Sequence, residues 1–263
     1  MKKGYGRFFF LSLLILLAVS SSSLAKEKEL VVSAAASLKD SFQEIGKIFM
    51  KKHKGVKVLF NFGGSGALRL QIEAGAPVDV FASAGQKDMD LLEKKGLVMK
   101  GTRHNFVENV IVLIAPIGSK LSSFADLKTP AVQRFAMGNP KTVPSGQYGE
   151  ETLKYQKLWE SLQGKIVYGE DVRQVLDYVA RKEVDAGIVF RTDALLRPKE
   201  VKIVAEAPNG SYTRPLYPIA VVAKTREPQL AKEFVALVLS PTGKKIFSKY
   251  GFMPVEPAKK KNG

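Results

Sequence analysis

Residues 30–40 read LVVSAAASLKD, and they pass directly from an apolar run into an amphipathic stretch that continues to Lys52. Apolar and amphipathic stretches go on alternating along the chain, at residues 56–60, 67–73, 78–82 and 87–95. Parallel strands need long crossover connections, usually helices, so this alternation predicts βαβ units. We therefore expect an α/β fold in which a mainly parallel sheet is flanked by helices.

Two non-periodic stretches, at residues 98–109 and 207–215, interrupt the alternation. Between them, strand-like and helix-like segments resume at residues 110–115, 134–137, 149–162, 166–168, 172–181 and 186–190. After the second interruption come a strand at 217–223 and helices at 229–239 and 242–250. We therefore predict two α/β lobes, the first made of residues 26–108 with 216–263 and the second of residues 109–215.

The composition limits the classes of function. The 263-residue chain has 41 lysine and arginine residues against 25 aspartate and glutamate residues, a formal net charge of +16, no cysteine and two histidines. Without cysteine there is no disulfide, thiolate metal site or thiol nucleophile, and two histidines leave few acid–base groups or metal ligands. We therefore expect neither an enzyme nor a directly bound metal ion. Scattered lysines without a clustered aromatic and basic motif also argue against a nucleic-acid binder.

The first 25 residues have the features of a secretory signal peptide. Three basic residues stand within the first seven positions, an apolar run covers residues 8–19, and Ser23 and Ala25 provide the small residues that a signal peptidase recognises. This apolar run is shorter than the roughly 20 residues that span a bilayer, which disfavours an uncleaved anchor. We predict cleavage after Ala25 and, because no cysteine is available for a lipid anchor, a protein free in the periplasm.

Four expected strand-to-helix junctions place serine or aspartate among small residues. They are AAASLKD at 34–40, NFGGSGAL at 61–68, VPSG at 143–146 and EDVR at 170–173. The first N–H groups of a helix have no intrahelical acceptor, so each junction is a potential anion site. Helix capping alone would explain any one of them, with Ser37 as N-cap and Asp40 as its capping-box partner in the first. Four together, two in each expected lobe, make capping alone a weaker explanation and favour a role in binding an anion.

Six motifs occur in an order that matches a known family. They are AAASL at 34–38, RLQIEAGAPVD at 69–79, VPSG at 143–146, EDVR at 170–173, GIVF with TDA within 187–194, and YGF at 250–252. On these motifs the chain resembles the periplasmic molybdate-binding proteins of bacterial ABC transporters, over essentially the whole expected mature chain. The resemblance implies the two-lobed type 2 periplasmic-binding-protein fold, in which the chain crosses twice between the lobes and the ligand lies in the cleft.

The resemblance places the oxyanion contacts on five residues. Ser37 and Ser65 would contribute hydroxyl and backbone N–H groups from one lobe, and Ser145 and Val172 would contribute backbone N–H groups from the other. At the fifth position the family often has a tyrosine whose hydroxyl donates to the ligand, whereas this chain has Phe190. The Ser145 hydroxyl could replace that donor, as could a bound water. Alternatively, Ser145 only caps its helix, or the specificity differs.

The donors in these motifs suit a fully deprotonated dianion. Molybdate, tungstate and sulfate have only acceptor oxygens at neutral pH, whereas monohydrogen phosphate carries a proton that requires an acceptor. The acids nearby, Asp40, Glu170 and Asp171, are explained as charges at helix N-termini. The resemblance implies high-affinity binding of molybdate, and of tungstate too, with molybdenum held only as its oxyanion and without a cofactor. A protein of the same fold for tungstate alone, sulfate or thiosulfate is the alternative.

Ligand contacts from both lobes would make the closed form the better binder. The resemblance implies that an inner-membrane permease, powered by a cytoplasmic ATPase, recognises the closed form and receives the anion. We expect the binding protein to be a monomer. A secreted enzyme and a nucleic-acid binder are the more remote alternatives.

Overall fold

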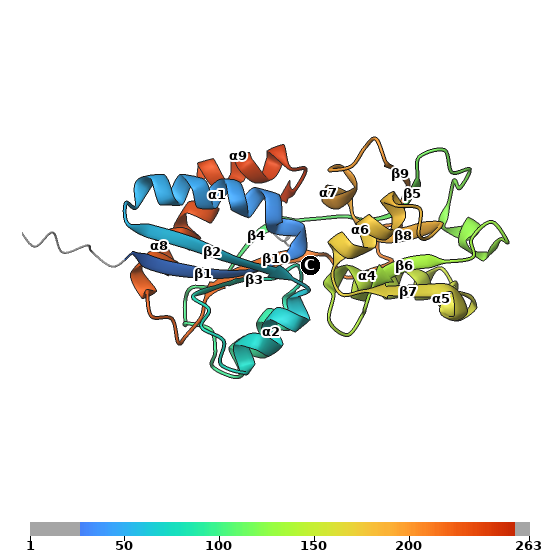
Figure 1. The fold of residues 1–263 in the computed structure, drawn as a ribbon. Coiled ribbons are helices and arrows are strands. Elements are labelled where there is room, and N and C mark those ends of the chain that lie inside the picture. Colours follow the sequence, from blue (N-terminus) through green and yellow to red (C-terminus); the bar gives the residue numbers. More distant parts are fainter. Residues whose placement is uncertain (1–26, 256–263) are drawn as a thin grey trace, which may run out of the picture.

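A six-stranded sheet organises the first of two lobes in the computed structural model, which describes residues 27–255 (Figure 1). Its strands lie in the order β11 (Met253–Pro254), β4 (His104–Glu108), β10 (Leu216–Val221), β3 (Val80–Ala82), β1 (Lys28–Ala35) and β2 (Val56–Gly63). β1 is parallel to β2 and β3, whereas β10 is antiparallel to β3 and β4, and β11 is antiparallel to β4. We call this sheet with its helices lobe 1. The predicted signal peptide, residues 1–25, lies outside the described residues.

Helices cover both faces of this sheet. One face carries α1 (Lys39–Lys52), α8 (Pro228–Leu239) and α9 (Pro241–Lys249), and the other carries α2 (Ser65–Glu73) and α3 (Gln86–Lys94). Beneath the first face the Phe42 ring packs against Phe106, Phe234 and Phe247, all of them buried. This aromatic layer holds α1, and therefore the turn that precedes it, at the carboxyl end of β1.

A five-stranded sheet forms lobe 2 (Figure 1). Its strands lie in the order β7 (Ile166–Gly169), β6 (Phe135–Gly138), β8 (Ala186–Phe190), β5 (Ile111–Pro116) and β9 (Val201–Glu206). β6 is parallel to β7 and β8, and β5 is antiparallel to β8 and β9. The helical segments of this lobe are η2 (Phe124–Lys128), α4 (Pro144–Tyr155), α5 (Trp159–Leu162), η3 (Gln163–Lys165), α6 (Val172–Ala180) and α7 (Arg191–Ala194). α4 and α6 pack directly on the sheet.

The chain passes between the lobes twice. It leaves lobe 1 after β4 and enters lobe 2 at β5, and it returns between β9 and β10. β10 lies inside the first sheet, between β3 and β4, so the returning chain completes lobe 1. Within residues 27–255 no helix combines the length and the hydropathy that a membrane span requires.

The predicted two-lobed α/β fold is confirmed, and each sheet is mixed. The strands next to the crossings, β4, β5, β9 and β10, run antiparallel to their neighbours, and they account for the antiparallel part of each sheet. The stretch expected to be non-periodic at 98–109 contains β4, and β9 is not predicted from the sequence. The helix predicted at 149–162 is divided into α4 and α5, because Lys157 between them adopts a φ of 57°.

Candidate functional site

One small pocket between the lobes is lined by all five residues that the resemblance implicates, Ser37 and Ser65 of lobe 1 and Ser145, Val172 and Phe190 of lobe 2. The other lining residues are Ala35, Ala36, Gly63, Gly64, Ala84, Val143, Pro144 and Asp171, most of them small. The cavity volume is about 10 Å³, far below the roughly 300–1,000 Å³ of pockets that hold drug-sized ligands. The pocket therefore suits a small ion.

The carboxyl ends of β1 and β2 bring the two serines of lobe 1 together. The strands are parallel with Ala35 opposite Gly63, so the segments that follow them emerge at the same edge of the sheet. After β1 comes a short 3₁₀ turn, η1 (Ala36–Leu38), which contains Ser37. After β2, α2 begins at Ser65.

The same arrangement recurs in lobe 2 at the carboxyl ends of β6 and β7. These strands are parallel, with Gly138 opposite Gly169. Ser145 is in the first turn of α4, which follows β6, and Val172 is the first residue of α6, which follows β7. Phe190 ends β8, the other neighbour of β6. The fold thus brings one helix start from each of two adjacent strands, in each lobe, to one pocket.

Helix starts supply N–H donors around this pocket. Ser65, Ser145 and Val172 lie in the first turns of α2, α4 and α6, where N–H groups have no acceptor within their own helix. The Asp171 carboxylate accepts from the next two N–H groups of α6, at 2.7 and 3.0 Å, and does not use the N–H of Val172. Asp171 is therefore a helix-capping acid, as predicted.

Ser37 does not cap a helix, contrary to the capping box predicted for residues 37–40. The residue that precedes α1 is Leu38, because the turn η1 separates β1 from α1. The Ser37 hydroxyl oxygen lies instead 3.2 Å from the Tyr217 hydroxyl oxygen. The Asp40 carboxylate accepts a hydrogen bond from Arg173 of lobe 2 at 2.8 Å. Both side chains thus interact with residues distant in the sequence rather than with their own helix.

The hydroxyl of Ser145 is buried without a partner. The residue is 0% exposed, and its Oγ makes no hydrogen bond within residues 27–255. It does not cap α4 either, because the N-cap position is occupied by Val143. A buried polar group without a partner costs about 1–3 kcal/mol. An acceptor atom in the pocket would remove that cost.

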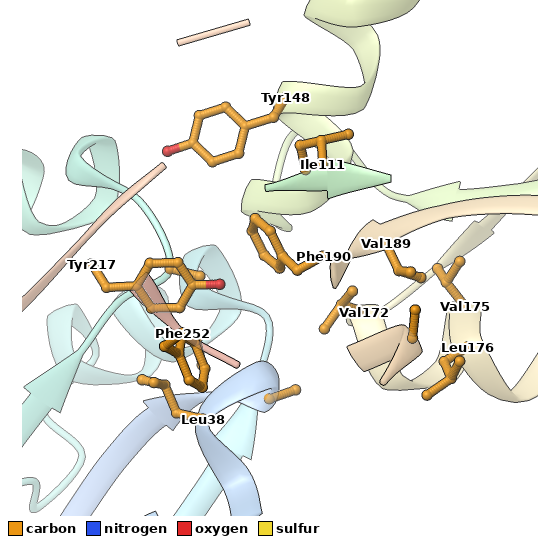
Figure 2. Packing of buried hydrophobic residues seen from close by; sticks show 14 of the residues in the cluster. Leu38, Ile111, Tyr148, Val172, Val175, Leu176, Val189, Phe190, Tyr217 and Phe252 are labelled. Atoms are coloured by element: carbon orange, nitrogen blue, oxygen red, sulfur yellow. The ribbon is translucent and has the colours of Figure 1, made fainter. Parts of the chain in front are cut away.

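Phe190 presents an aromatic ring to the pocket, at the position where the resemblance implies a tyrosine. The ring packs between those of Tyr148 and Tyr217, at centroid distances of 6.3 and 5.6 Å (Figure 2). A phenylalanine ring has no polar atom, so this position supplies no hydrogen-bond donor. The Ser145 hydroxyl belongs to the same lobe and lines the same pocket.

The described lining of the pocket contains no lysine or arginine, and its one charged residue, Asp171, uses its carboxylate to cap α6. Arg173 lies behind Ser37, where it donates to the Ser37 carbonyl at 3.3 Å, to Asp40 at 2.8 Å and to Asp193 at 2.5 Å. Burial alone would lower the pKa of Arg173, but the two carboxylates outweigh it and raise that pKa. Burial raises the pKa of Asp193 to about 6, although Arg173 opposes this shift. Arg173 therefore joins the lobes through its ion pair with Asp40 and its hydrogen bond to the Ser37 carbonyl, whereas its pair with Asp193 lies within lobe 2.

Main-chain contacts bring the lobes together beside the pocket. The N–H of Gly66 in lobe 1 donates to the carbonyl of Thr142 in lobe 2 at 2.8 Å. A Cβ atom at Gly66 would lie 2.7 Å from the Cα of Thr142, and one at Gly64 would lie 2.7 Å from the carbonyl oxygen of Glu170. Backbone atoms cannot give way like a flexible side chain, so this closure requires glycine at both positions.

Three residues next to the pocket were not predicted from the sequence as parts of the site. Arg173 stands in the EDVR motif, but its partners belong to distant elements. Asn109 and Tyr217 flank the two crossings, and their side chains are hydrogen bonded at 3.1 Å. The sequence contains one signal that could have identified part of this group: Asn109 is a lone amide residue directly before an apolar run.

Comparisons with known proteins agree with this geometry. A family model described as bacterial extracellular solute-binding protein matches residues 30–253. The chain belongs to this family. The solute-binding protein is 40% identical over 235 residues to the molybdate-binding protein ModA of Escherichia coli K12, with 87% of this chain and 90% of ModA covered. It is 42% identical over 229 residues to the putative ABC transporter substrate-binding lipoprotein YvgL of Bacillus subtilis, with 86% and 87% covered.

A solved structure supports the same relationship. The periplasmic molybdate-binding protein of Azotobacter vinelandii superposes on the solute-binding protein with a TM-score of 0.77 at 25% identity, and the match covers 87% of this chain and 99% of that chain. The resemblance to molybdate-binding proteins that the motifs predict is thus confirmed.

The histidines lie away from the pocket of the solute-binding protein. His53 stacks on Phe49 at a centroid distance of 4.1 Å, and His104 is exposed at the start of β4. Within the described chain no group of three or more histidine, aspartate or glutamate side chains could hold a metal ion. The groups that line the pocket are suited to binding an anion by hydrogen bonds.

Gly66→Ala tests whether binding depends on the approach of the lobes. The added methyl group would collide with Thr142 of lobe 2, whereas alanine is a better helix former than glycine and should not weaken α2. We expect molybdate affinity, measured by calorimetry, to fall by at least about tenfold without a lower melting temperature of the free protein. Gly164→Ala is the control, because nothing lies within 4 Å of a Cβ there. Equal affinities of the two variants would contradict the prediction.

Asp40→Asn tests the ion pair between the lobes. The substitution removes the carboxylate that Arg173 reaches across the cleft and keeps the pair of Arg173 with Asp193. We expect molybdate affinity to fall about three- to tenfold, and less at 0.5 M salt, because the pair is partly exposed and screened. Glu44→Gln, one turn further along α1, is the control, since within residues 27–255 Glu44 bonds only to Lys249 and Tyr250 of lobe 1. A loss of the same size in that variant would count against the prediction.

Proposed function

We propose that this solute-binding protein binds molybdate, and tungstate as well, and delivers it to an ABC-transporter permease that a cytoplasmic ATPase powers. The observation that carries the proposal is a small pocket lined by donors from both lobes, with the buried and unpartnered hydroxyl of Ser145 among them. The relatives named as molybdate-binding proteins support the choice of anion. The proposed role is binding and delivery without catalysis and without a cofactor.

Four residues would donate to the anion, and Phe190 would lie beside it without a donor. We propose that Ser37 and Ser65 donate through their hydroxyl and N–H groups, and that Ser145 and Val172 donate through N–H groups. Ser65 suits this role because its oxygen already accepts from the N–H of Ala84 at 3.0 Å, so that its hydrogen is available. The Ser145 hydroxyl would supply the donor that Phe190 lacks. Such a site binds a fully deprotonated dianion and leaves the proton of monohydrogen phosphate unpaired.

The export and organisation of the chain belong to the same proposal. We propose that the signal peptide is cleaved after Ala25 and that the mature protein is a periplasmic monomer. Residues 26–108 with 216–263 would form one lobe and residues 109–215 the other. The extracellular family and the basic and apolar composition of the first 25 residues support this assignment.

Thermal unfolding in different anions tests the proposed ligand. A ligand at 100 times its dissociation constant stabilises the folded state by about 2.7 kcal/mol, which corresponds to about 5–10 °C for a protein of this size. We expect this shift with molybdate and with tungstate, and a smaller one or none with sulfate and phosphate at the same concentration. No shift with molybdate or tungstate would overturn the proposal. A shift with sulfate alone would identify a sulfate-binding protein.

Ser145→Ala tests the hydroxyl that is available in the pocket. A hydrogen bond to a charged group contributes about 1.5–3 kcal/mol, so we expect molybdate affinity to fall by about 10- to 100-fold. Ser211→Ala removes another buried hydroxyl of this lobe, bonded to Thr152 outside the pocket, and should leave the affinity unchanged. Adding Phe190→Tyr to Ser145→Ala should restore affinity, because it supplies the donor often found in the family. An unaltered affinity of Ser145→Ala would show that the hydroxyl does not contact the ligand.

A further inference from the structure

We propose that Tyr217 is a positioning residue that fixes the Ser37 hydroxyl as a hydrogen-bond donor toward the bound oxyanion. The inference rests on the proposed function and deepens it, because it names the residue that makes the Ser37 hydroxyl a donor rather than an acceptor toward the ligand. Tyr217 belongs to β10, directly after the second crossing, and Ser37 lies in the turn after β1. Their oxygens are 3.2 Å apart.

The direction of the hydrogen bonds is set at Asn109, next to the first crossing. Its Oδ1 accepts from the N–H of Val110 at 2.9 Å, which leaves its Nδ2 facing Thr192 and Tyr217. The Nδ2 atom lies 2.9 Å from the Thr192 hydroxyl oxygen and 3.1 Å from the Tyr217 hydroxyl oxygen. A side-chain amide nitrogen only donates, so the Tyr217 oxygen accepts this bond.

The Tyr217 hydroxyl must then donate to Ser37. Tyr217 is 0% exposed, and within residues 27–255 its oxygen has only Asn109 and Ser37 as partners. If Ser37 were the donor, the hydroxyl hydrogen of Tyr217 would be buried without an acceptor, an arrangement that native proteins avoid. Burial also raises the pKa of Tyr217 well above its usual value, so the hydroxyl keeps its proton.

Ser37 is left with one hydrogen, and that hydrogen is directed away from Tyr217. The Ser37 hydroxyl has no other partner in the described chain, and the residue lines the pocket. Its oxygen is already used as an acceptor, so it offers the pocket a donor. The Ser65 hydroxyl is arranged in the same way: its oxygen accepts from the N–H of Ala84, and its hydrogen remains available to the pocket. A ligand oxygen that carries only lone pairs can accept from both serines. The hydrogen of a ligand hydroxyl would instead face the hydrogens of these serines.

The network is buried where the lobes join. Asn109, Thr192, Ser37 and Tyr217 are each no more than 3% exposed. The Tyr217 ring lies beside Phe190, with its hydroxyl directed toward lobe 2 (Figure 2). This burial shields the bonds among Asn109, Tyr217 and Ser37 from water, so Tyr217 and Asn109 orient the Ser37 hydroxyl.

Tyr217→Phe removes the phenol hydroxyl and keeps the ring. Without it the Ser37 hydroxyl can rotate, and we expect molybdate affinity, measured by calorimetry, to fall by about tenfold. Tyr212→Phe is the matched control: the Tyr212 hydroxyl lies in the second crossing, accepts from the N–H of Ile111 at 3.3 Å and does not contact Ser37. That variant should keep the wild-type affinity, and melting temperatures show whether both variants are folded.

A double-mutant cycle distinguishes positioning from general stability. If Tyr217 acts through Ser37, Tyr217→Phe should cause no further loss of molybdate affinity in the Ser37→Ala protein. Asn109→Ala, which removes the group that sets the direction, should weaken binding in the wild type and likewise not in Ser37→Ala. Additive losses in both cycles, or equal affinities of Tyr217→Phe and Tyr212→Phe, would overturn the inference alone. A wild-type protein that does not bind molybdate would overturn the proposed function on which it rests.

Discussion

An anion that leaves water for a protein interior needs a hydrogen-bond donor at each of its oxygens, because an uncompensated buried charge is far more costly than any single contact repays. The described lining of the pocket contains no lysine or arginine that could meet this requirement with a full charge. In the proposed site, backbone N–H groups at helix starts and serine hydroxyls meet it instead. Their partial charges are aimed by the fold, so the position of each helix start determines what the pocket can hold.

The two sheets provide this positioning in the same way. In each lobe a pair of adjacent parallel strands ends in register, Ala35 opposite Gly63 and Gly138 opposite Gly169, and a helical segment follows each strand. Aromatic packing around Phe42 fixes α1 against the sheet and the other helices of lobe 1. The residues between strand and helix are small because the opposite lobe approaches closely. The small size of the pocket and the abundance of glycine and alanine around it therefore have one cause.

Local patterns in the sequence predicted much of this arrangement. The parts that depend on contacts between residues far apart in the sequence could not be predicted. The βαβ alternation and the serines at helix starts are local signals, and they led to a pocket that Ser37 and Ser65 do line. The capping role of Ser37 was wrong because a 3₁₀ turn replaces the first turn of the helix, and the sequence of that turn is equally compatible with a cap. The bonds of Tyr217 and Arg173 join segments more than a hundred residues apart, for which a single sequence has no signal.

The place of β10 between β3 and β4 also determines the order in which the chain can assemble. Lobe 2 is formed by one continuous segment, whereas the sheet of lobe 1 lacks an interior strand until the chain has passed Val221. Pairings of such long sequence separation form late, because the intervening chain must first be ordered. Lobe 1 therefore stays incomplete for most of the time during which the chain emerges. The proposed export in an unfolded state would gain from this delay, since the discontinuous lobe cannot close before residues 216–221 have arrived.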